Sequence, residues 1–410
     1  MRRIAWALLL LFAFAIPWEY SLDLGEPLGN IARILGLVLL LAVVPAVLQA
    51  GRLRTPGAMQ WVVLALYLWF CCTYFWTIAP LATLEKMRGY FQEMMIVWLV
   101  WEFAESPEDL RALMRAYIAG SWVLAALTLA NFGSAEAIAA GQIRFVAEGQ
   151  DPNDVARFLD LGLPMAALLV NSERRWPARL LAVGYLPVGL VAVVLTASRG
   201  GFLAAVVALA GSGLLLMRSH PRQVLAGALA LPVLAAALWV GVPHETLERL
   251  ATIPTQLQGG DLNQRWNIWE AGWGAFVRSP VAGSGAGAFV SAARTNPLDT
   301  AHNTALSIAV GGGLIGLSLA VGIVVLAMRA ALEARGLLKV ALGTVLAVLV
   351  TASLVDTVEE NRATWLLLGM IALAGRLAVD APEPLAECFP AGSSVGGSAP
   401  APSLACRPAN

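Results

Sequence analysis

Apolar runs of about 17 to 25 residues recur along nearly the whole chain of 410 residues. An α-helix rises about 1.5 Å per residue, so a run of this length crosses the roughly 30 Å hydrocarbon core of a bilayer. One such run can be a buried helix of a soluble protein, but about a dozen cannot. The sequence therefore predicts an all-α, polytopic membrane protein with about 12 transmembrane helices.

The composition agrees with this prediction and limits the possible partners. Hydrophobic residues make up 59% of the chain and charged residues only 13%, whereas a soluble domain carries about 25% charged residues. The formal net charge is zero. No basic field attracts nucleic acid, so we expect membrane lipids as partners and no nucleic acid.

The expected helices form one transmembrane domain over residues 1–380, interrupted by a single large loop at 243–301 between the ninth and tenth helices. They are expected near residues 4–18, 31–49, 60–78, 86–103, 110–131, 154–171, 179–197, 200–217, 223–242, 303–328, 337–355 and 362–379. The start, Met1-Arg2-Arg3 before an apolar stretch, is similar to a signal peptide but lacks a clear small-residue cleavage site. We expect it to be a retained first helix.

Arginine and lysine are concentrated in every second connector, which predicts the orientation of the chain. By the positive-inside rule these basic connectors face the cytoplasm, so both termini lie inside and the loop 243–301 faces outward. The basic residues concerned are Arg2, Arg3, Arg52, Arg54, Arg111, Arg115, Arg174, Arg175, Arg179, Arg218, Arg222, Arg329, Arg335 and Lys339.

Residues 381–410 are rich in Pro, Gly, Ser and Ala, which bury too little apolar surface to fold. We expect a disordered cytoplasmic tail. Two cysteines, Cys71 and Cys72, lie in an apolar run and two, Cys388 and Cys406, lie in this tail. Their spacing predicts neither a metal site nor a disulfide framework.

The outward connectors contain few cations, and these cluster beside helix ends. They are Lys86, Arg88, Arg144, Arg157, Arg199, Arg265, Arg278, Arg294 and Arg362. Ionisable groups near the membrane often face a cavity, and the planar guanidinium binds phosphate oxygens in a bidentate manner. The cluster predicts an anionic substrate. The alternative is that these side chains snorkel to the interface or pair with Glu85, Glu148 or Glu270.

Three segments of the outward face contain candidate binding groups. The turn Thr196-Ala197-Ser198-Arg199-Gly200-Gly201 is either a plain helix hairpin or a place where glycines admit a ligand close to the backbone. Arg265 opens a segment in which Trp266, Trp269 and Trp273 are spaced for one helical face, although tryptophan also commonly rests at the membrane interface. His302 precedes the tenth helix and is the best general-base candidate, because a neutral imidazole accepts a proton from a hydroxyl.

Taken together, these motifs resemble the O-antigen ligase and polymerase superfamily of membrane glycosyltransferases. The resemblance covers about the central two fifths of the chain. In order, the matching motifs are Asp151-Pro152-Asn153, Leu163-Pro164, Thr196-Ala197-Ser198-Arg199-Gly200-Gly201, Arg265, Trp269, Pro280, Gly283, Gly285, His302-Asn303, Leu306, Gly313 and Gly316. One departure is that Gly311 or Gly312 stands where many members have a glutamate.

The resemblance implies a metal-independent, inverting glycosyltransferase of the bacterial inner membrane, with its active site facing the periplasm and no cofactor. An undecaprenyl-diphosphate-linked glycan is the implied donor, and lipid A-core or a growing glycan is the implied acceptor. The implied catalytic residues are His302, Arg199 and Arg265. The residues expected to bind diphosphate or glycan are Arg88, Arg144, Arg157, Asn153, Ser198, Asn303 and Trp269.

Three functions remain open from the sequence. An O-antigen ligase that modifies lipid A-core is the first, and a polymerase of O-antigen or exopolysaccharide is the second. These two differ in the acceptor, which the sequence does not display. An anion transporter is the third, but a long Trp-rich loop and the lack of visible inverted repeats are not typical of that class.

Overall fold

The computed structural model describes residues 1–25, 29–260, 262, 264–296 and 299–380, together with 383, 385, 388 and 389. Most of the expected tail at 381–410 therefore lies outside the described residues. Within the described part, the chain is α-helical and contains no strand beyond an isolated bridge between Asp23 and Asn30. This confirms the all-α class.

Within the described ranges, a long helix occupies each of the twelve positions expected. These helices are α1 (Arg2–Ala15), α2 (Ile31–Ala50), α3 (Ala58–Cys72), α4 (Pro80–Phe103), α5 (Pro107–Phe132), α7 (Pro152–Ser172), α8 (Trp176–Leu195), α9 (Arg199–Met217), α10 (Pro221–Gly241), α15 (Thr304–Glu333), α16 (Gly336–Ser353) and α17 (Arg362–Asp380). The shorter elements are α6 (Ala135–Ala139), α11 (His244–Ala251), α12 (Ile253–Leu257), α13 (Arg265–Arg278) and α14 (Phe289–Ala293), with 3₁₀ turns at Ile16–Ser21, Thr73–Phe75 and Val358–Glu360.

Ten of the described helices are long and apolar enough to cross a membrane, so the chain is a multi-pass membrane protein. The other two long helices are α4 and α10. Helix α4 carries several charges, among them Glu85, Lys86 and Arg88 near its start. The apolar part of α10, Gly227–Gly241, is shorter than a full span. Both occupy the places of expected spans.

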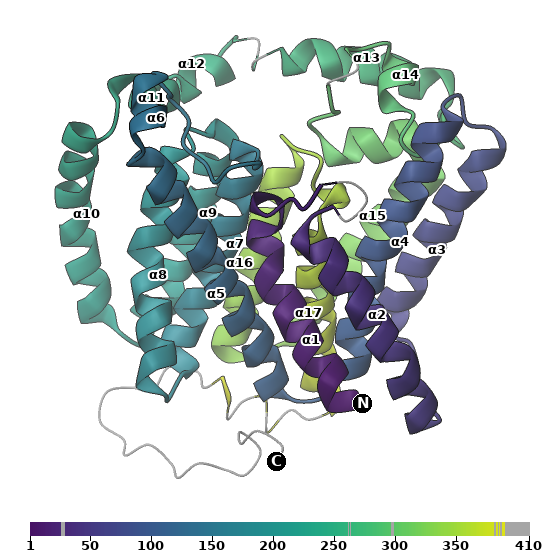
Figure 1. The fold of residues 1–410 in the computed structure, drawn as a ribbon, viewed down its shortest axis with the longest axis horizontal. Coiled ribbons are helices and arrows are strands. Elements are labelled where there is room, and N and C mark those ends of the chain that lie inside the picture. The colour runs from purple at the N-terminus through teal and green to yellow at the C-terminus, as the bar shows by residue number, and fades with distance from the viewer. Residues whose placement is uncertain are drawn as a thin grey trace.

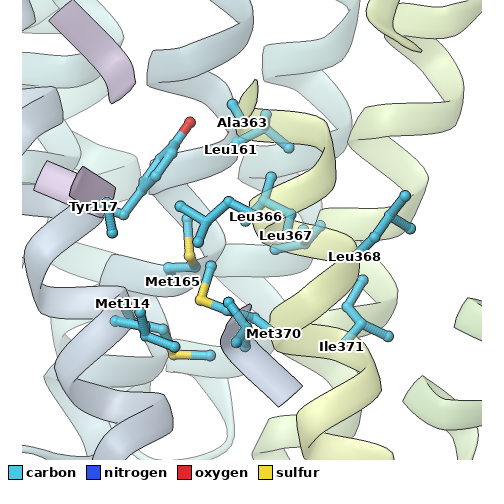
Figure 2. Close-up of a cluster of buried hydrophobic side chains, with 14 of the residues drawn as sticks. Met114, Tyr117, Leu161, Met165, Ala363, Leu366, Leu367, Leu368, Met370 and Ile371 are labelled. Carbon is cyan, nitrogen blue, oxygen red and sulfur yellow. The ribbon is translucent and has the colours of Figure 1, made fainter. Parts of the chain in front are cut away.

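Helix α7 lies at the centre of the bundle and organises the core. It packs against α5, α8, α9 and α16, and nearly all of its apolar window is buried. Figure 2 shows where α5 and α7 meet α17, with Met114, Tyr117 and Met165 facing Leu366 and Met370. Because α7 begins at Pro152, this burial fixes the position of the residues just before and after its N-terminus.

The two ends of the bundle differ in charge. Arg2 pairs with Glu102 and Glu105, so the start of α1 is tied to the end of α4. Arg115 pairs with Glu108 and Glu173 at the same end. Helices α11 to α14 lie at the opposite end, where they cross over the long helices (Figure 1). We refer to this second end as the loop end.

The loop end is attached to the bundle through a break in α15. Gly313 has φ 65°, in the left-handed region, and interrupts the helix. Residues after α13 fill the break, because the Ser284 amide donates to the Val310 carbonyl at 2.8 Å and the Leu314 amide donates to the Pro280 carbonyl at 2.8 Å. A Cβ on Gly313 meets the Val281 carbonyl oxygen at 2.2 Å. Only glycine allows this approach.

Candidate active site

A cavity of about 260 Å³ lies at the loop end, between the starts of α7 and α9 and the helices α11 to α13. We call it the arginine cavity because Arg144, Arg199, Arg249 and Arg265 all line it. The other lining residues are Asp151, Asn153, Gly200, Leu203, Ile253, Gln256, Leu262, Trp269, His302 and Val355. Segments far apart in the sequence therefore meet here, including six of the ten site residues expected from the sequence.

The turn between α8 and α9 builds one wall of the arginine cavity. Ala197 has φ 48°, and its carbonyl accepts a hydrogen bond from Nε of Arg249 at 3.2 Å. The Thr196 carbonyl accepts from Nε of Arg144, also at 3.2 Å. The turn thus holds two arginines through backbone oxygens, which leaves their remaining N–H groups for a ligand.

Ser198 and Asn153 fix this turn to the start of α7. The Ser198 hydroxyl donates to Oδ1 of Asn153 at 2.8 Å and accepts from the Gly201 amide at 3.1 Å, which caps α9. Asn153 Oδ1 also lies 3.4 Å from Nη2 of Arg144. Asn153 lines the cavity, but the hydroxyl of Ser198 is fully used in this network, and Ser198 is 1% exposed. The structure gives Ser198 a positioning task.

The arginine cavity is strongly electropositive. None of its four arginines forms an ion pair within the described part of the chain, and Asp151 is its one acidic lining residue. Burial lowers the pKa of Arg144 to about 10, and Arg249 contributes in the same direction. Burial also lowers the pKa of Arg265 and of Arg249. All remain charged at neutral pH, so the cavity suits an anion.

His302 lines the arginine cavity at the start of α15. Its φ of 44° is in the left-handed region, which histidine adopts more readily than most residues with a side chain. Its neighbours fix it in place: the Ala301 carbonyl accepts from Nε1 of Trp269 at 3.1 Å, and Asn303 caps α15 by accepting from the Leu306 amide at 2.9 Å. Nδ1 of His302 is buried and makes no hydrogen bond with the described residues.

The surroundings of His302 favour its neutral form. Burial lowers the pKa of His302 from 6.5, and the charge of Arg265 lowers it further. Asp356 and Asp151 oppose the shift, but they do not reverse it. The imidazole is therefore neutral at physiological pH and able to accept a proton.

Helix α13 places Arg265 and Trp269 one turn apart on the same face, and both side chains line the cavity. The three tryptophans that the sequence places on one helical face differ in exposure. Trp266 and Trp273 are 62% and 60% exposed, whereas Trp269 is half-buried and hydrogen-bonded. A helix repeats every 3.6 residues, so the spacings of three and seven leave Trp269 rotated toward the cavity.

Besides Ser198, three expected binding residues do not line the arginine cavity. Arg157 lies beneath it and is 2% exposed, with its guanidinium paired to Asp154 and Asp356. Asn303 uses its amide to cap α15 and to donate to the Leu354 carbonyl at 3.1 Å. Arg88 is exposed on α4. The structure thus gives Arg157 and Asn303 structural partners and does not bring Arg88 to the site.

Three of the four remaining outward cations contact protein groups, as in the alternative interpretation. Lys86 pairs with Glu360, and Arg362 pairs with Glu19. Arg278 donates to the Ala292 carbonyl at 2.5 Å. The partners Glu19 and Glu360 differ from those expected, because they are brought close only by the packing of α1, α4 and α17.

The sequence prediction missed Arg249, which lies in the loop on α11. Arg249 could have been found from the sequence, because it is a cation in an outward connector that contains few cations. Asp356 was also missed, and its pairing with Arg157 depends on the fold. Among the described residues, no group of three His, Cys, Asp or Glu side chains is arranged to hold a metal ion.

Residues 183–321 match the O-antigen ligase family model. This segment includes the α8–α9 turn, Arg249, Arg265 and His302. The match covers about a third of the chain and supports its resemblance to the O-antigen ligase and polymerase superfamily. The search of curated proteins finds no match. Members of this superfamily are glycosyltransferase-like enzymes, so the arginine cavity is the candidate active site of an enzyme of that class.

Proposed function

We propose that this O-antigen ligase family member transfers a glycan from an undecaprenyl-diphosphate carrier to an acceptor hydroxyl on the periplasmic side of the bacterial inner membrane, with lipid A-core as acceptor. The observation that carries the proposal is the meeting of four arginines and a neutral histidine in one cavity. Arginines are suited to bind the diphosphate of the donor, and a neutral histidine is suited to activate the acceptor hydroxyl.

In the proposed reaction, His302 takes the proton of the acceptor hydroxyl as its oxygen attacks the anomeric carbon of the donor. The new C–O bond forms on the face opposite the leaving group, while the bond from this carbon to the diphosphate breaks. The diphosphate leaves with the bonding electron pair. A single displacement of this kind inverts the configuration at the anomeric carbon.

The arginines would stabilise the charge that develops on the leaving diphosphate. Arg199 stands at the start of α9 and Arg265 at the start of α13, and both line the cavity, so we propose that a diphosphate bound there contacts both. Fixed guanidinium groups inside a half-closed cavity stabilise a developing anion without reorganising. We therefore also propose that transfer needs no divalent cation.

Purified protein in lipid nanodiscs, given an undecaprenyl-diphosphate-linked glycan and lipid A-core, tests the proposal. His302→Ala should lower transfer by about 10²- to 10⁴-fold and leave donor binding largely intact, because the base contacts the acceptor. The matched control is His244→Ala, a histidine that is 57% exposed on α11 and does not line the cavity.

Several outcomes distinguish the alternatives. A product of linked repeating units, with no glycan on lipid A-core, would assign a polymerase. Uptake of labelled anion into vesicles without any transfer would assign a transporter. Full transfer by His302→Ala would refute the assigned base, and loss of activity with chelator that magnesium restores would refute metal independence.

A further inference from the structure

A second cavity, of about 160 Å³, lies on the other side of the residues around His302. We call it the polar cavity. Its polar lining consists of Lys86, Asp299, Thr300, Ser307, Thr357 and Glu360. It also has aromatic walls, which include Phe70, Tyr90 and Phe289. Hydroxyl and carboxylate groups beside aromatic faces are typical of sites for small polar ligands.

A thin wall separates the polar cavity from the arginine cavity. Ala301 lines the polar cavity, and the adjacent His302 lines the arginine cavity. Likewise, Thr357 lines the polar cavity, and Val355, two residues before it, lines the arginine cavity. Hydrogen bonds of Thr304 hold the wall together, since its hydroxyl donates to the Asp356 carbonyl at 2.9 Å and accepts from the Val358 amide at 2.9 Å. The polar cavity is therefore one residue away from the assigned base.

An apolar hollow of about 110 Å³ adjoins the polar cavity. The two share Phe70, Tyr90 and Ile308 as walls. The hollow reaches Val324 on α15 and Val350 on α16, whose side chains are 40% and 41% exposed on membrane-spanning helices. It thus opens toward the lipid between these helices.

A buried carboxylate stands at the junction of the two spaces. Glu359 lines the apolar hollow, and the next residue, Glu360, lines the polar cavity. Glu359 is 5% exposed, and its carboxylate oxygens make no hydrogen bond of normal geometry with the described residues, although the Ser307 hydroxyl faces them. An unsatisfied buried carboxylate costs free energy, which a hydroxyl donor from a ligand would recover.

The charges of the two cavities point to different ligands. Four arginines and one aspartate line the arginine cavity, whereas the polar cavity has Asp299, Glu360 and Lys86, the last already paired with Glu360. A diphosphate therefore favours the first cavity. The second accepts an uncharged group with several hydroxyls, joined to a hydrocarbon chain that fits the hollow.

We propose that the polar cavity and the apolar hollow together bind the acceptor as a lipid-linked sugar, with hydroxyls at Glu359, Glu360 and Thr357 and the chain between α15 and α16. This inference rests on the proposed function for the identity of the acceptor, but the binding site itself is testable without transfer.

Photo-crosslinking in nanodiscs tests the site. The probes are octyl glycosides of glucose, galactose and N-acetylglucosamine with a diazirine in the alkyl chain, and the matched probe has a phosphocholine head on the same chain. At least one glycoside should label Leu346, Leu349 or neighbouring residues of α16 in preference to the phosphocholine probe. Val350→Trp fills the hollow and should reduce labelling about five-fold or more. Val325→Trp, at a 60% exposed position that does not line the hollow, should leave it unchanged.

Two conservative variants test the sugar contacts. Glu359→Gln and Thr357→Val should each lower glycoside labelling about three- to ten-fold, as expected for the loss of one hydrogen bond, and should not change phosphocholine labelling. Retained donor binding by each variant shows that it is folded. The proposal would be overturned if all head groups gave the same labelling, or if the labelled residues lay outside α15 to α17. It would also be overturned if none of the three variants Val350→Trp, Glu359→Gln and Thr357→Val changed the labelling.

The two proposals fail in distinguishable ways. His302→Ala should still be labelled, because it alters the chemistry and not the pocket. If the glycosides label the hollow while no glycan transfer occurs, the site stands and the proposed function fails. If transfer occurs and Val350→Trp, Glu359→Gln and Thr357→Val all leave its dependence on acceptor concentration unchanged, the proposed function stands and the acceptor site is elsewhere.

Discussion

At the scale of single residues, the chain separates two kinds of outward arginine that look alike in the sequence. Arg157 and Arg362 are paired with carboxylates that the fold brings to them, whereas Arg199 and Arg265 line a cavity without such a partner. The residue type and its place beside a helix end were predictable. The division was predictable only in part: Asp154 precedes Arg157 by three residues, but Asp356 and Glu19 are far away in sequence from the arginines they pair with.

The pH dependence of transfer should report the environment of His302. Burial and Arg265 lower its pKa from 6.5, and the base acts only when neutral. The rate should therefore be constant near neutral pH and should fall only as the pH drops through a value below 6.5. A profile of transfer rate from about pH 5 to about pH 8 checks this, given that donor binding is saturated. An acidic midpoint above the ordinary histidine value would contradict the geometry.

Removal of a cavity arginine should weaken the binding of the donor as well as turnover. Arg199→Ala, Arg265→Ala and Arg249→Ala should each cost about 1.5 to 3 kcal/mol in donor binding, the usual range for a charge-assisted hydrogen bond. Lysine at Arg199 or Arg265 should restore only part of this, because it lacks the planar fork. Donor affinity is measured by titration of purified variants in nanodiscs.

The control for this series is Arg294→Ala, since Arg294 is exposed at the loop end and does not line the arginine cavity. It should bind the donor with native affinity. Unchanged affinity and rate in the Arg199 and Arg265 variants would instead mean that these side chains only anchor the protein at the interface.

At the scale of elements, the positions of the long helices followed from apolar periodicity, but their junctions did not. The pair Gly200-Gly201 was read as a possible approach to a ligand. Gly200 does line the arginine cavity, whereas a Cβ on Gly201 meets the Ala156 side chain at 2.2 Å. The second glycine thus serves the contact of α9 with α7. Likewise, the break of α15 at Gly313 depends on residues that precede it by some thirty positions and was not visible in its own apolar run.

A pair of glycine substitutions on α9 tests this reading. Gly201→Ala should lower thermal stability, because overpacking at such a contact typically costs about 1 to 3 kcal/mol. It should also lower transfer, because the contact positions Ser198 and Arg199. Gly213→Ala lies on the same helix with nothing within 4 Å of the added Cβ, so it should be neutral or slightly stabilising.

The melting temperatures of both variants in the same detergent check the comparison. Equal stability of Gly201→Ala and Gly213→Ala would show that α7 and α9 can move apart without cost, and the explanation by close packing would be wrong.

At the scale of the whole molecule, one short connector links the spaces described above. Residues 354–361, between α16 and α17, contribute Val355 to the arginine cavity, Thr357 and Glu360 to the polar cavity, and Glu359 to the apolar hollow. In the sequence analysis it was only the connector between the helices expected at 337–355 and 362–379. Its role depends on α15, α16 and α17 ending at the same level, which no local pattern encodes.

The orientation of the molecule is the prediction on which the proposed reaction depends. The ion pairs of Arg2, Arg54 and Arg115 gather basic connectors at one end. Helices α11 to α13, which contribute to the lining of the arginine cavity, lie at the other end (Figure 1). By the positive-inside rule the end that contains these ion pairs is cytoplasmic.

A reporter that is active only outside the cytoplasm should therefore work when inserted after Gln258, on the loop between α12 and α13, and fail when inserted after Trp176 or Arg335. Full-length insertions are needed, because truncation removes helices that hold the bundle together, and a cytoplasm-active reporter at the same three positions provides the matched control. Both reporters giving the reverse pattern would place the arginine cavity on the cytoplasmic side, and transfer on the periplasmic side would then be impossible at this site.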